Sequence, residues 1–253
     1  MLILFRDFID NIDNYATQSE TFLDVPFVPT DEDVVEAMLN LANIGPKDVL
    51  YDLGSGDGRI LISAAIDRNT RGVGIDLDPV RIADAMEEAG YAGVELLVDF
   101  IEGDIFDADI SEATVVTLYL LQSVNVQLRP RLLSQLQPGS RIVSHAFNMG
   151  DWKADNWITV DGINIYKWVV PAQIAGVREW QDGEGRSYRV ELQQQYQEIT
   201  GNAWIDGVEV FLESVNLCGK HLELRIRNDI TSSPSTCMLT FENGEIRSVA
   251  FSE

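Results

Sequence analysis

Two short apolar stretches, each running into an acidic residue, constrain the fold of this chain more than any other feature. The first leads into the sequence DLGSGDG at residues 52–58, and the second is GVGID at residues 72–76. Each pattern predicts a parallel strand that delivers a carboxylate, Asp52 or Asp76, to a shared crevice where ligands of open α/β sheets bind. Glycines at alternate positions let the backbone turn sharply and approach a ligand closely.

The spacing of these glycines argues against two nucleotide-binding motifs. A dinucleotide fingerprint requires G-x-G-x-x-G, but Arg59 occupies the position of the third glycine. A Walker A loop requires G-x-x-x-x-G-K-[ST], and no lysine follows these glycines. An NAD-dependent oxidoreductase is therefore disfavoured. A glycine-rich turn in an unrelated α/β protein is the alternative that the pattern leaves open.

The order of three motifs resembles one enzyme family. DLGSGDG at 52–58, GVGID at 72–76 and EGD at 102–104 together resemble motif I and the later acidic positions of the class I, seven-strand S-adenosylmethionine-dependent methyltransferases. The resemblance extends from about Val28 to Pro171. It implies an α/β fold with a doubly wound, mostly parallel seven-strand sheet, S-adenosyl-L-methionine as the cofactor, and methyl transfer as the activity.

The resemblance also assigns parts of the cofactor to residues of this sequence. Asp52 resembles the acid that holds the methionine amino group, Asp76 the acid that accepts both ribose hydroxyls, and Asp104 the acid that binds the adenine amino group. Helix capping by Asp52 and Asp76, and a merely solvated loop around Asp104, are the structural alternatives. The other cofactor-binding candidates are Thr30, Gly54, Ser55, Gly56, Leu77 and Ile105.

Upstream of motif I, the sequence VPFVPT at 25–30 resembles an element that precedes the first helix in a subset of these enzymes. That subset includes the seven-strand protein-lysine methyltransferases, and there the element closes over the methionine tail. The resemblance implies that Thr30 bonds the cofactor carboxylate. Thr30 is also predicted to be the N-cap of the following helix, a role compatible with the first.

Tyr119 and His145 are the catalytic candidates, because they fall at the ends of the predicted fourth and fifth strands. The sequence LYLL at 118–121 stands where amino-methylating nucleic-acid enzymes of this class carry Asn/Asp-Pro-Pro-Tyr/Phe. Tyr119 can orient an amine, and histidine can act as a general base. A core tyrosine and a structural histidine are the alternatives. Trp152 is predicted to be a substrate wall, a lid or core.

The chain is divided into three predicted regions: an N-terminal extension at 1–24, the methyltransferase domain at 25–171, and a small antiparallel all-β domain at 172–253. A helix at 122–136 is predicted to be kinked or broken at Pro130. Asp161-Gly162 predicts a β-hairpin with a type I′ turn. The remaining strands of the first domain are predicted at 48–53, 71–76, 94–101, 113–120 and 140–146.

The amino-acid composition constrains both the class of methyl acceptor and the cellular location of the protein. The formal net charge is −23, with 41 acidic and 18 basic residues, which disfavours a nucleic-acid acceptor and favours a basic protein or a small molecule. The two cysteines predict no disulfide framework and no metal site. No signal peptide or apolar run of membrane length is recognised, so a cytoplasmic protein without membrane association is expected. The oligomeric state stays open.

These observations predict an S-adenosylmethionine-dependent methyltransferase that acts on nitrogen, with a protein lysine as the first acceptor. A small-molecule acceptor and a non-catalytic module that only binds the cofactor are the rival interpretations. No chemistry is predicted for the C-terminal domain; a binding or dimerisation role is one interpretation, and stabilisation of the sheet edge is the other.

Overall fold

The computed structural model describes residues 27–228 and 233–252 of the 253-residue chain. The chain forms two compact units. One contains the chain up to Gln135 together with Ile142–Trp168, and the other contains Leu136–Arg141 and the chain from Val169 onward. The predicted N-terminal extension at 1–24 lies outside the described residues.

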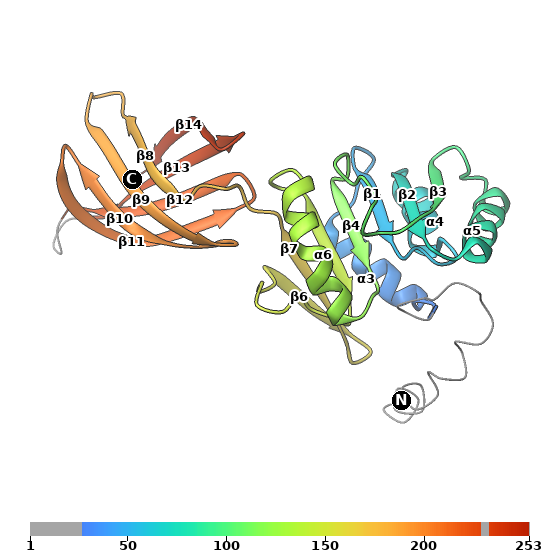
Figure 1. Ribbon diagram of the computed structural model, residues 1–253. Helices are drawn as coiled ribbons and strands as arrows, with labels where there is room; N and C mark the ends of the chain where they lie inside the picture. Colours follow the sequence, from blue (N-terminus) through green and yellow to red (C-terminus); the bar gives the residue numbers. More distant parts are fainter. Residues whose placement is uncertain (1–26, 229–232, 253) are drawn as a thin grey trace. The chain divides into compact units, whose positions relative to one another are not determined.

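The first sheet has seven strands in the order β3-β2-β1-β4-β5-β7-β6 (Figure 1). β1 pairs in parallel with β2 and β4, and β2 pairs in parallel with β3. This arrangement confirms the predicted doubly wound, mostly parallel sheet. Its strands are β1 (Val49–Leu53), β2 (Arg71–Asp76), β3 (Val98–Glu102), β4 (Val115–Leu118), β5 (Arg141–His145), β6 (Asn156–Val160) and β7 (Ile163–Val169).

Two predicted strands are shorter than expected. The prediction at 94–101 started too early, because the Leu97 N–H donates to the Val94 carbonyl in a turn and β3 begins only at Val98. Of the strand predicted at 113–120, only Val115–Leu118 is observed, as β4. The antiparallel hairpin β6–β7 agrees with the prediction. Asp161 and Gly162 both have positive φ, as a type I′ turn requires.

Four helices accompany the first sheet: α3 (Glu32–Ala42), α4 (Arg59–Arg68), α5 (Pro79–Ala92) and α6 (Gln122–Gln135). α3 packs on α4, and α4 packs on α5, while α6 lies over the sheet face that is in view in Figure 1. Of the kink or break predicted at Pro130, the break does not occur, because α6 continues through this residue. Pro130 lacks the N–H that would donate to the Val126 carbonyl, and α6 tolerates the loss of this one hydrogen bond.

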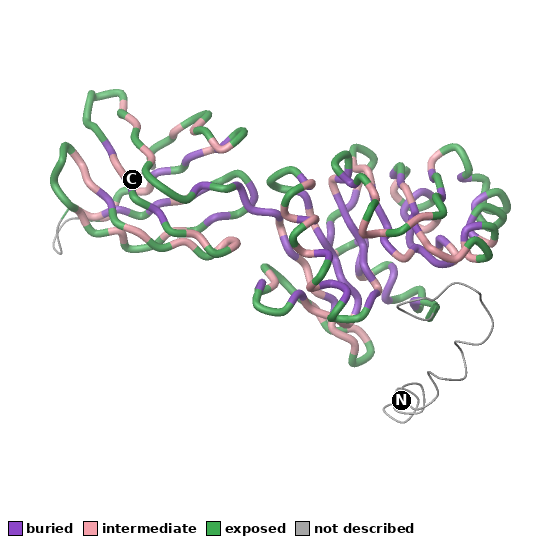
Figure 2. The backbone as a smooth tube through the Cα atoms, in the orientation of Figure 1, coloured by how far each residue is buried: buried purple, intermediate pink, exposed green. Residues whose placement is uncertain are grey.

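The core of the first unit follows the strands, whose buried segments are purple in Figure 2. β1 and β4 are buried almost throughout, as expected for central strands covered on both faces. Trp152 also belongs to the interior: it is 1% exposed, and its carbonyl accepts a 2.9 Å hydrogen bond from Trp168 Nε1. The interpretation of Trp152 as core therefore holds, and it is no lid.

The second sheet is an antiparallel meander in the order β14-β13-β12-β11-β10-β9-β8. It confirms the predicted C-terminal β fold, although β8 was not predicted. One apolar cluster fills it, including Leu192, Leu224 and Phe241. Its strands are β8 (Gly176–Gln181), β9 (Ser187–Gln195), β10 (Glu198–Ile205), β11 (Val208–Cys218), β12 (His221–Arg227), β13 (Ser235–Glu242) and β14 (Glu245–Ser252).

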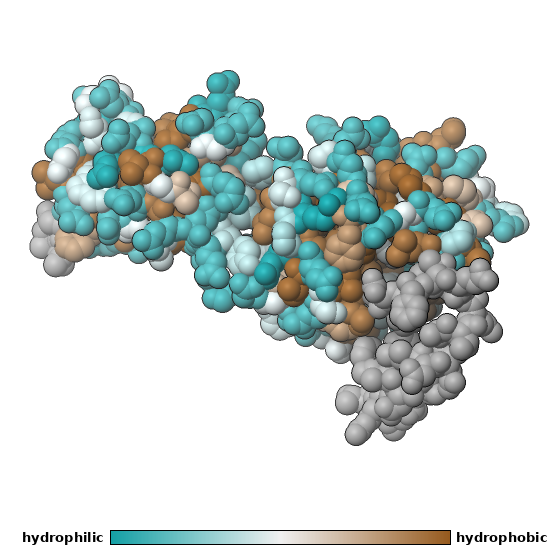
Figure 3. All heavy atoms as spheres, viewed as in Figure 1, coloured by the Kyte–Doolittle hydropathy of each residue, from teal (hydrophilic) through white to brown (hydrophobic). Residues whose placement is uncertain are grey.

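The surface in view in Figure 3 is mostly hydrophilic, with smaller hydrophobic areas between the polar residues. In the part of the chain that the structure describes, no helix has the length and apolar character needed to cross a membrane.

Candidate functional site

A cavity opens beyond the carboxyl ends of β1, β2 and β4, where open α/β sheets bind ligands. It brings together all but one of the site residues predicted from the sequence, and the exception is His145. The lining residues are Phe27, Val28, Pro29, Thr30, Asp52, Gly54, Ser55, Gly56, Asp57, Arg59, Ile60, Asp76, Leu77, Asp78, Arg81, Asp104, Ile105, Phe106, Tyr119, Leu120 and Val124.

Asp52, on β1, is one of the residues that line this cavity. The residue is 2% exposed, and its Oδ1 accepts a 2.7 Å hydrogen bond from Thr117 Oγ1. Burial raises the pKa of Asp52 to about 7, a rise that the Thr117 hydrogen bond opposes and the charges of Asp76 and Asp57 reinforce. Such a carboxylate is matched by a cationic ligand, as the ammonium group of S-adenosylmethionine would be.

The glycines of motif I are required by the close approach of other side chains. Gly56 has a φ of +53°, and a Cβ atom there would lie 2.4 Å from the Phe27 ring. Gly58 has a φ of +76°, and its Cβ would lie 2.5 Å from the Phe100 ring on β3. A larger residue at either position therefore meets both backbone strain and a clash. Gly58, rather than Asp52, is the N-cap of α4.

Asp76 holds the motif I loop and the start of the next loop at the same time. Its Oδ2 accepts the Gly56 N–H at 2.8 Å, and its Oδ1 accepts the Asp78 N–H at 2.9 Å. The N-cap of α5 is Asp78, whose side chain accepts the Val80 N–H, so Asp76 is not the cap. Each oxygen of Asp76 keeps a lone pair that can accept a hydroxyl hydrogen from a ribose.

Apolar and acidic side chains share the region beyond β3. Asp104 is exposed, and its Oδ1 accepts the Phe106 N–H at 2.8 Å. Leu77, Ile105 and Phe106 line the same cavity. An acidic acceptor beside apolar side chains fits a flat, largely apolar base with an exocyclic amine, such as adenine.

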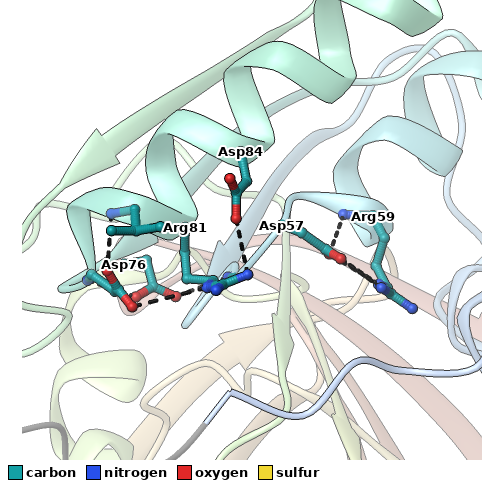
Figure 4. A network of polar contacts seen from close by, with 8 residues as sticks. Asp57, Arg59, Asp76, Arg81 and Asp84 are labelled. Carbon is teal, nitrogen blue, oxygen red and sulfur yellow. Dashed lines mark hydrogen bonds and ion pairs between the residues drawn. The ribbon is translucent and has the colours of Figure 1, made fainter. Parts of the chain in front are cut away.

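An arginine side chain links the segment before α3 to motif I through a hydrogen bond and an ion pair. Arg59 donates from Nη1 to the Thr30 carbonyl at 2.8 Å, and its Nη2 lies 2.5 Å from Asp57 Oδ2. Figure 4 shows the two side chains pointing toward each other. Burial acts to raise the pKa of Asp57, but the hydrogen bonds and charge of Arg59 outweigh it and hold this pKa below its usual value.

A second arginine covers Phe27 near the same cavity. The Arg81 guanidinium carbon lies 4.7 Å from the centroid of the Phe27 ring, a cation–π distance. Arg81 Nη1 also lies 2.9 Å from Asp84 Oδ2 (Figure 4). Sequence reasoning missed Phe27, Asp57, Arg59 and Arg81 as site residues. The arginine in place of the third glycine was the available signal for Arg59, but it was used only to exclude a dinucleotide fold.

Thr30 does not cap α3, contrary to the prediction. The helix begins at Glu32 and its N-cap is Asp31, whose side chain makes no capping hydrogen bond. Thr30 is instead 3% exposed and lines the cavity. Its Oγ1 lies 3.4 Å from His145 Nδ1.

Tyr119 and His145 lie together, but only Tyr119 lines the cavity. Their rings are stacked, with centroids 3.7 Å apart and an interplanar angle of 23°. His145 is 3% exposed. Burial lowers its pKa to about 4, and the charge of Asp31 opposes this shift. Burial raises the pKa of Tyr119, and the charge of Asp31 raises it further. Tyr119 therefore stays a neutral phenol at physiological pH.

Comparison with known proteins locates this chain among methyltransferases. Residues 52–156 match the family described as the ANTKMT methyltransferase domain. A protein-lysine N-methyltransferase of Saccharolobus islandicus is 44% identical over 142 residues, covering 56% of this chain and 88% of that protein. The adenine nucleotide translocase lysine N-methyltransferase of Mus musculus is 31% identical over 131 residues, and the chain spans 57% of its length.

A solved structure agrees with these matches. It is an RNA methyltransferase from Salinibacter ruber in complex with S-adenosyl-L-homocysteine, 55% identical, with a TM-score of 0.57. The match covers 58% of this chain and 96% of the other.

Proposed function

Because the chain belongs to the class I S-adenosylmethionine-dependent methyltransferases, in the group that contains protein-lysine N-methyltransferases, we propose that it methylates the side-chain nitrogen of a protein lysine. The chain is an S-adenosylmethionine-dependent enzyme. The observation that carries the choice of acceptor is the 44% identity to the Saccharolobus islandicus lysine methyltransferase over 88% of that protein.

The charges around the site support a cationic acceptor. The negative charge of Asp31 acts on both Tyr119 and His145. The net charge of −23 attracts a lysine-bearing protein over longer distances, an effect that weakens with salt.

Residues of this chain are proposed to hold the cofactor in four places. Asp52 would receive the methionine ammonium group, and Thr30 the carboxylate. Asp76 would accept the ribose hydroxyls, while Asp104 would bind the adenine amine beside Leu77 and Ile105. Gly54, Ser55 and Gly56 would provide the backbone that contacts the ribose and methionine. The contacts described above support each assignment.

S-adenosylmethionine supplies an activated methyl group on a sulfonium. When bound, it would supply this methyl group to a deprotonated lysine Nζ, with the N–CH₃ bond made as the S–CH₃ bond is broken, and S-adenosylhomocysteine would be the product. One proton leaves the lysine ammonium for solvent before the attack. Tyr119, on the cavity wall, is proposed to orient the amine, and alignment of this kind supplies much of the rate enhancement in such reactions.

RNA is the competing acceptor class, because the Salinibacter ruber protein is titled an RNA methyltransferase. The acidic charge of this chain disfavours it, since RNA-binding surfaces are normally basic. We also propose a cytoplasmic location, which the free thiols of Cys218 and Cys237 support; cell fractionation tests it.

The acceptor is tested with cofactor that carries a labelled methyl group. The enzyme is incubated with lysate from which the protein, RNA and small-molecule fractions are then separated. The Asp52→Ala variant serves as the inactive control. We expect label in protein, located on lysine by mass spectrometry. Label confined to RNA or to a metabolite would overturn the proposal and identify the acceptor class directly.

A further inference from the structure

Three residues from separate segments connect the cavity to the end of β5. Thr30 precedes α3, Tyr119 follows β4, and His145 ends β5. His145 Nδ1 lies 3.4 Å from Thr30 Oγ1, and its ring stacks on Tyr119 at 3.7 Å. Thr30 and Tyr119 line the cavity, whereas His145 does not line it and is 3% exposed.

The environment of His145 is unsuited to a general base. A base must reach the proton that it removes, and His145 does not line the cavity. Burial lowers its pKa to about 4, with Asp31 as the charged group that acts against this shift. The imidazole is therefore neutral at physiological pH and carries one N–H donor and one acceptor nitrogen.

The backbone beside His145 is held in an uncommon conformation. Ala146 has a φ of +64°, and the Phe147 N–H donates to the His145 carbonyl at 2.8 Å. A hydrogen bond between residues two apart around a positive φ marks a strained γ-turn. Ala146 N–H donates to the Asn164 carbonyl at 2.8 Å, and Asn125 Nδ2 to the Phe147 carbonyl at 3.3 Å. Strain of this kind persists where surrounding contacts fix one geometry.

We propose that His145 is a positioning residue that couples the cofactor site to the acceptor site. Its Nδ1–H donates to Thr30 Oγ1, which leaves the Thr30 hydroxyl hydrogen free to bind the cofactor carboxylate. The face of its ring holds Tyr119 against the cavity wall, where the acceptor amine binds. The effect on acceptor binding rests on the proposed function, whereas the effect on cofactor binding does not.

Two substitutions of His145 test separately its effect on cofactor binding and its effect on acceptor binding. His145→Phe keeps a stacking ring and removes the Nδ1 donor, so we expect S-adenosylhomocysteine to bind about fivefold more weakly, the effect of one neutral hydrogen bond. His145→Asn keeps a donor near the Nδ1 position and removes the ring. We expect nearly unchanged cofactor affinity and a severalfold higher KM for the acceptor.

Thr30→Val tests the same hydrogen bond from its other end. It should weaken cofactor binding at least as much as His145→Phe, because it also removes the hydroxyl that binds the carboxylate. In the double variant Thr30→Val/His145→Phe, the loss of cofactor affinity should be no larger than in Thr30→Val alone. Calorimetry with S-adenosylhomocysteine measures all of these affinities without an acceptor, so they remain informative if lysine is not the acceptor.

His221→Phe is the matched control. His221 Nδ1 lies 3.2 Å from Thr240 Oγ1 in the second unit, so the same kind of contact is removed far from motif I in sequence. Cofactor affinity and turnover should not change. Because the chain has only two histidines, this variant also assigns the imidazole signals in nitrogen-15 NMR spectra. His145 should show the Nδ1–H tautomer.

Two outcomes would overturn the inference. One is an unchanged cofactor affinity in folded His145→Phe and Thr30→Val, judged by thermal unfolding. The other is a loss of turnover of 100-fold or more in both His145 variants, together with loss of an ionisation from the pH profile of kcat, the behaviour expected of a general base.

Discussion

The buried carboxylate of Asp52 accepts a 2.7 Å hydrogen bond from the hydroxyl of Thr117 on the neighbouring strand. That bond favours the ionised carboxylate, but burial disfavours it more strongly and raises the pKa to about 7. In the ligand-free protein, Asp52 therefore changes charge near physiological pH. A cationic group that enters the cavity favours the ionised form and releases the proton.

Cofactor affinity should accordingly increase with pH. Below about pH 7 the carboxylate of free Asp52 is protonated, so binding must remove a proton and the affinity for S-adenosylhomocysteine falls by up to about tenfold per pH unit. Calorimetry between about pH 5.5 and 8 in buffers of different ionisation enthalpy measures both the affinity and the released proton. Asp52→Asn should bind more weakly at pH 8 and lose most of the pH dependence.

The stability of the ligand-free protein provides an independent measurement of the same group. Because the folded-state pKa of Asp52 lies above the ordinary aspartate value of 3.8, the folded protein retains a proton that the unfolded chain loses. The contribution of Asp52 to stability is therefore full below about pH 4 and declines as pH rises to about 7. Asp52→Asn should unfold at a higher temperature than the unsubstituted protein at pH 8. Equal pH dependence in both proteins would contradict the assignment.

Gly56→Ala should disturb the cofactor site. The new methyl group meets the Phe27 ring at 2.4 Å on a residue with a φ of +53°, so Phe27 must move and the loop is strained. We expect at least tenfold weaker cofactor binding and a loss of about 1 kcal/mol in stability. Gly90→Ala is the control: Gly90 is in α5 with no atom within 4 Å of its Cβ position. It should stabilise the protein by about 0.5–1 kcal/mol.

Asp31→Asn should weaken acceptor binding more than cofactor binding. Its charge acts on Tyr119 and His145, and its side chain does not cap α3. We expect a severalfold higher KM for a lysine-bearing substrate, with a smaller salt dependence than in the unsubstituted enzyme. Asp33→Asn, in the first turn of the same helix, is the control. Equal effects of the two substitutions would mean that only the overall charge matters.

A chain of residues 1–171 should bind S-adenosylhomocysteine with unchanged affinity. Among the residues that the structure describes, those that line the cavity lie between Phe27 and Val124, and the Salinibacter ruber structure is covered over 96% of its length by 58% of this chain. Circular dichroism shows whether the shortened chain folds, and calorimetry measures binding. A folded but non-binding chain would show that the C-terminal unit supports the cofactor site.

Local sequence chemistry was sufficient to predict the parallel sheet and the cavity. Alternating apolar strands and helices define the first sheet, and Asp52 on β1, Asp76 at the end of β2 and Asp104 after β3 all line the same cavity. Carboxyl ends of neighbouring parallel strands must converge, so sequence order alone brings these residues together.

Features that depend on tertiary contacts were not predictable in the same way. The exclusion of His145 from the cavity wall follows from its stacking on Tyr119 and its contact with Thr30, residues distant in sequence. The ion pair of Arg59 with Asp57 is local, but its bond to the Thr30 carbonyl required the fold. β8 was missed because Gly176–Gln181 has charged and polar residues on an exposed face.

The meander of the second sheet has a kinetic consequence. Every strand there pairs with its neighbour in sequence, so each hairpin closes a short loop. In the first sheet, Leu50 of β1 must find Val115 of β4 before the centre is complete. Folding slows as the separation of contacting residues grows. In stopped-flow refolding, we expect the C-terminal strands to acquire hydrogen-exchange protection first, while the cofactor-binding sheet forms in a later phase.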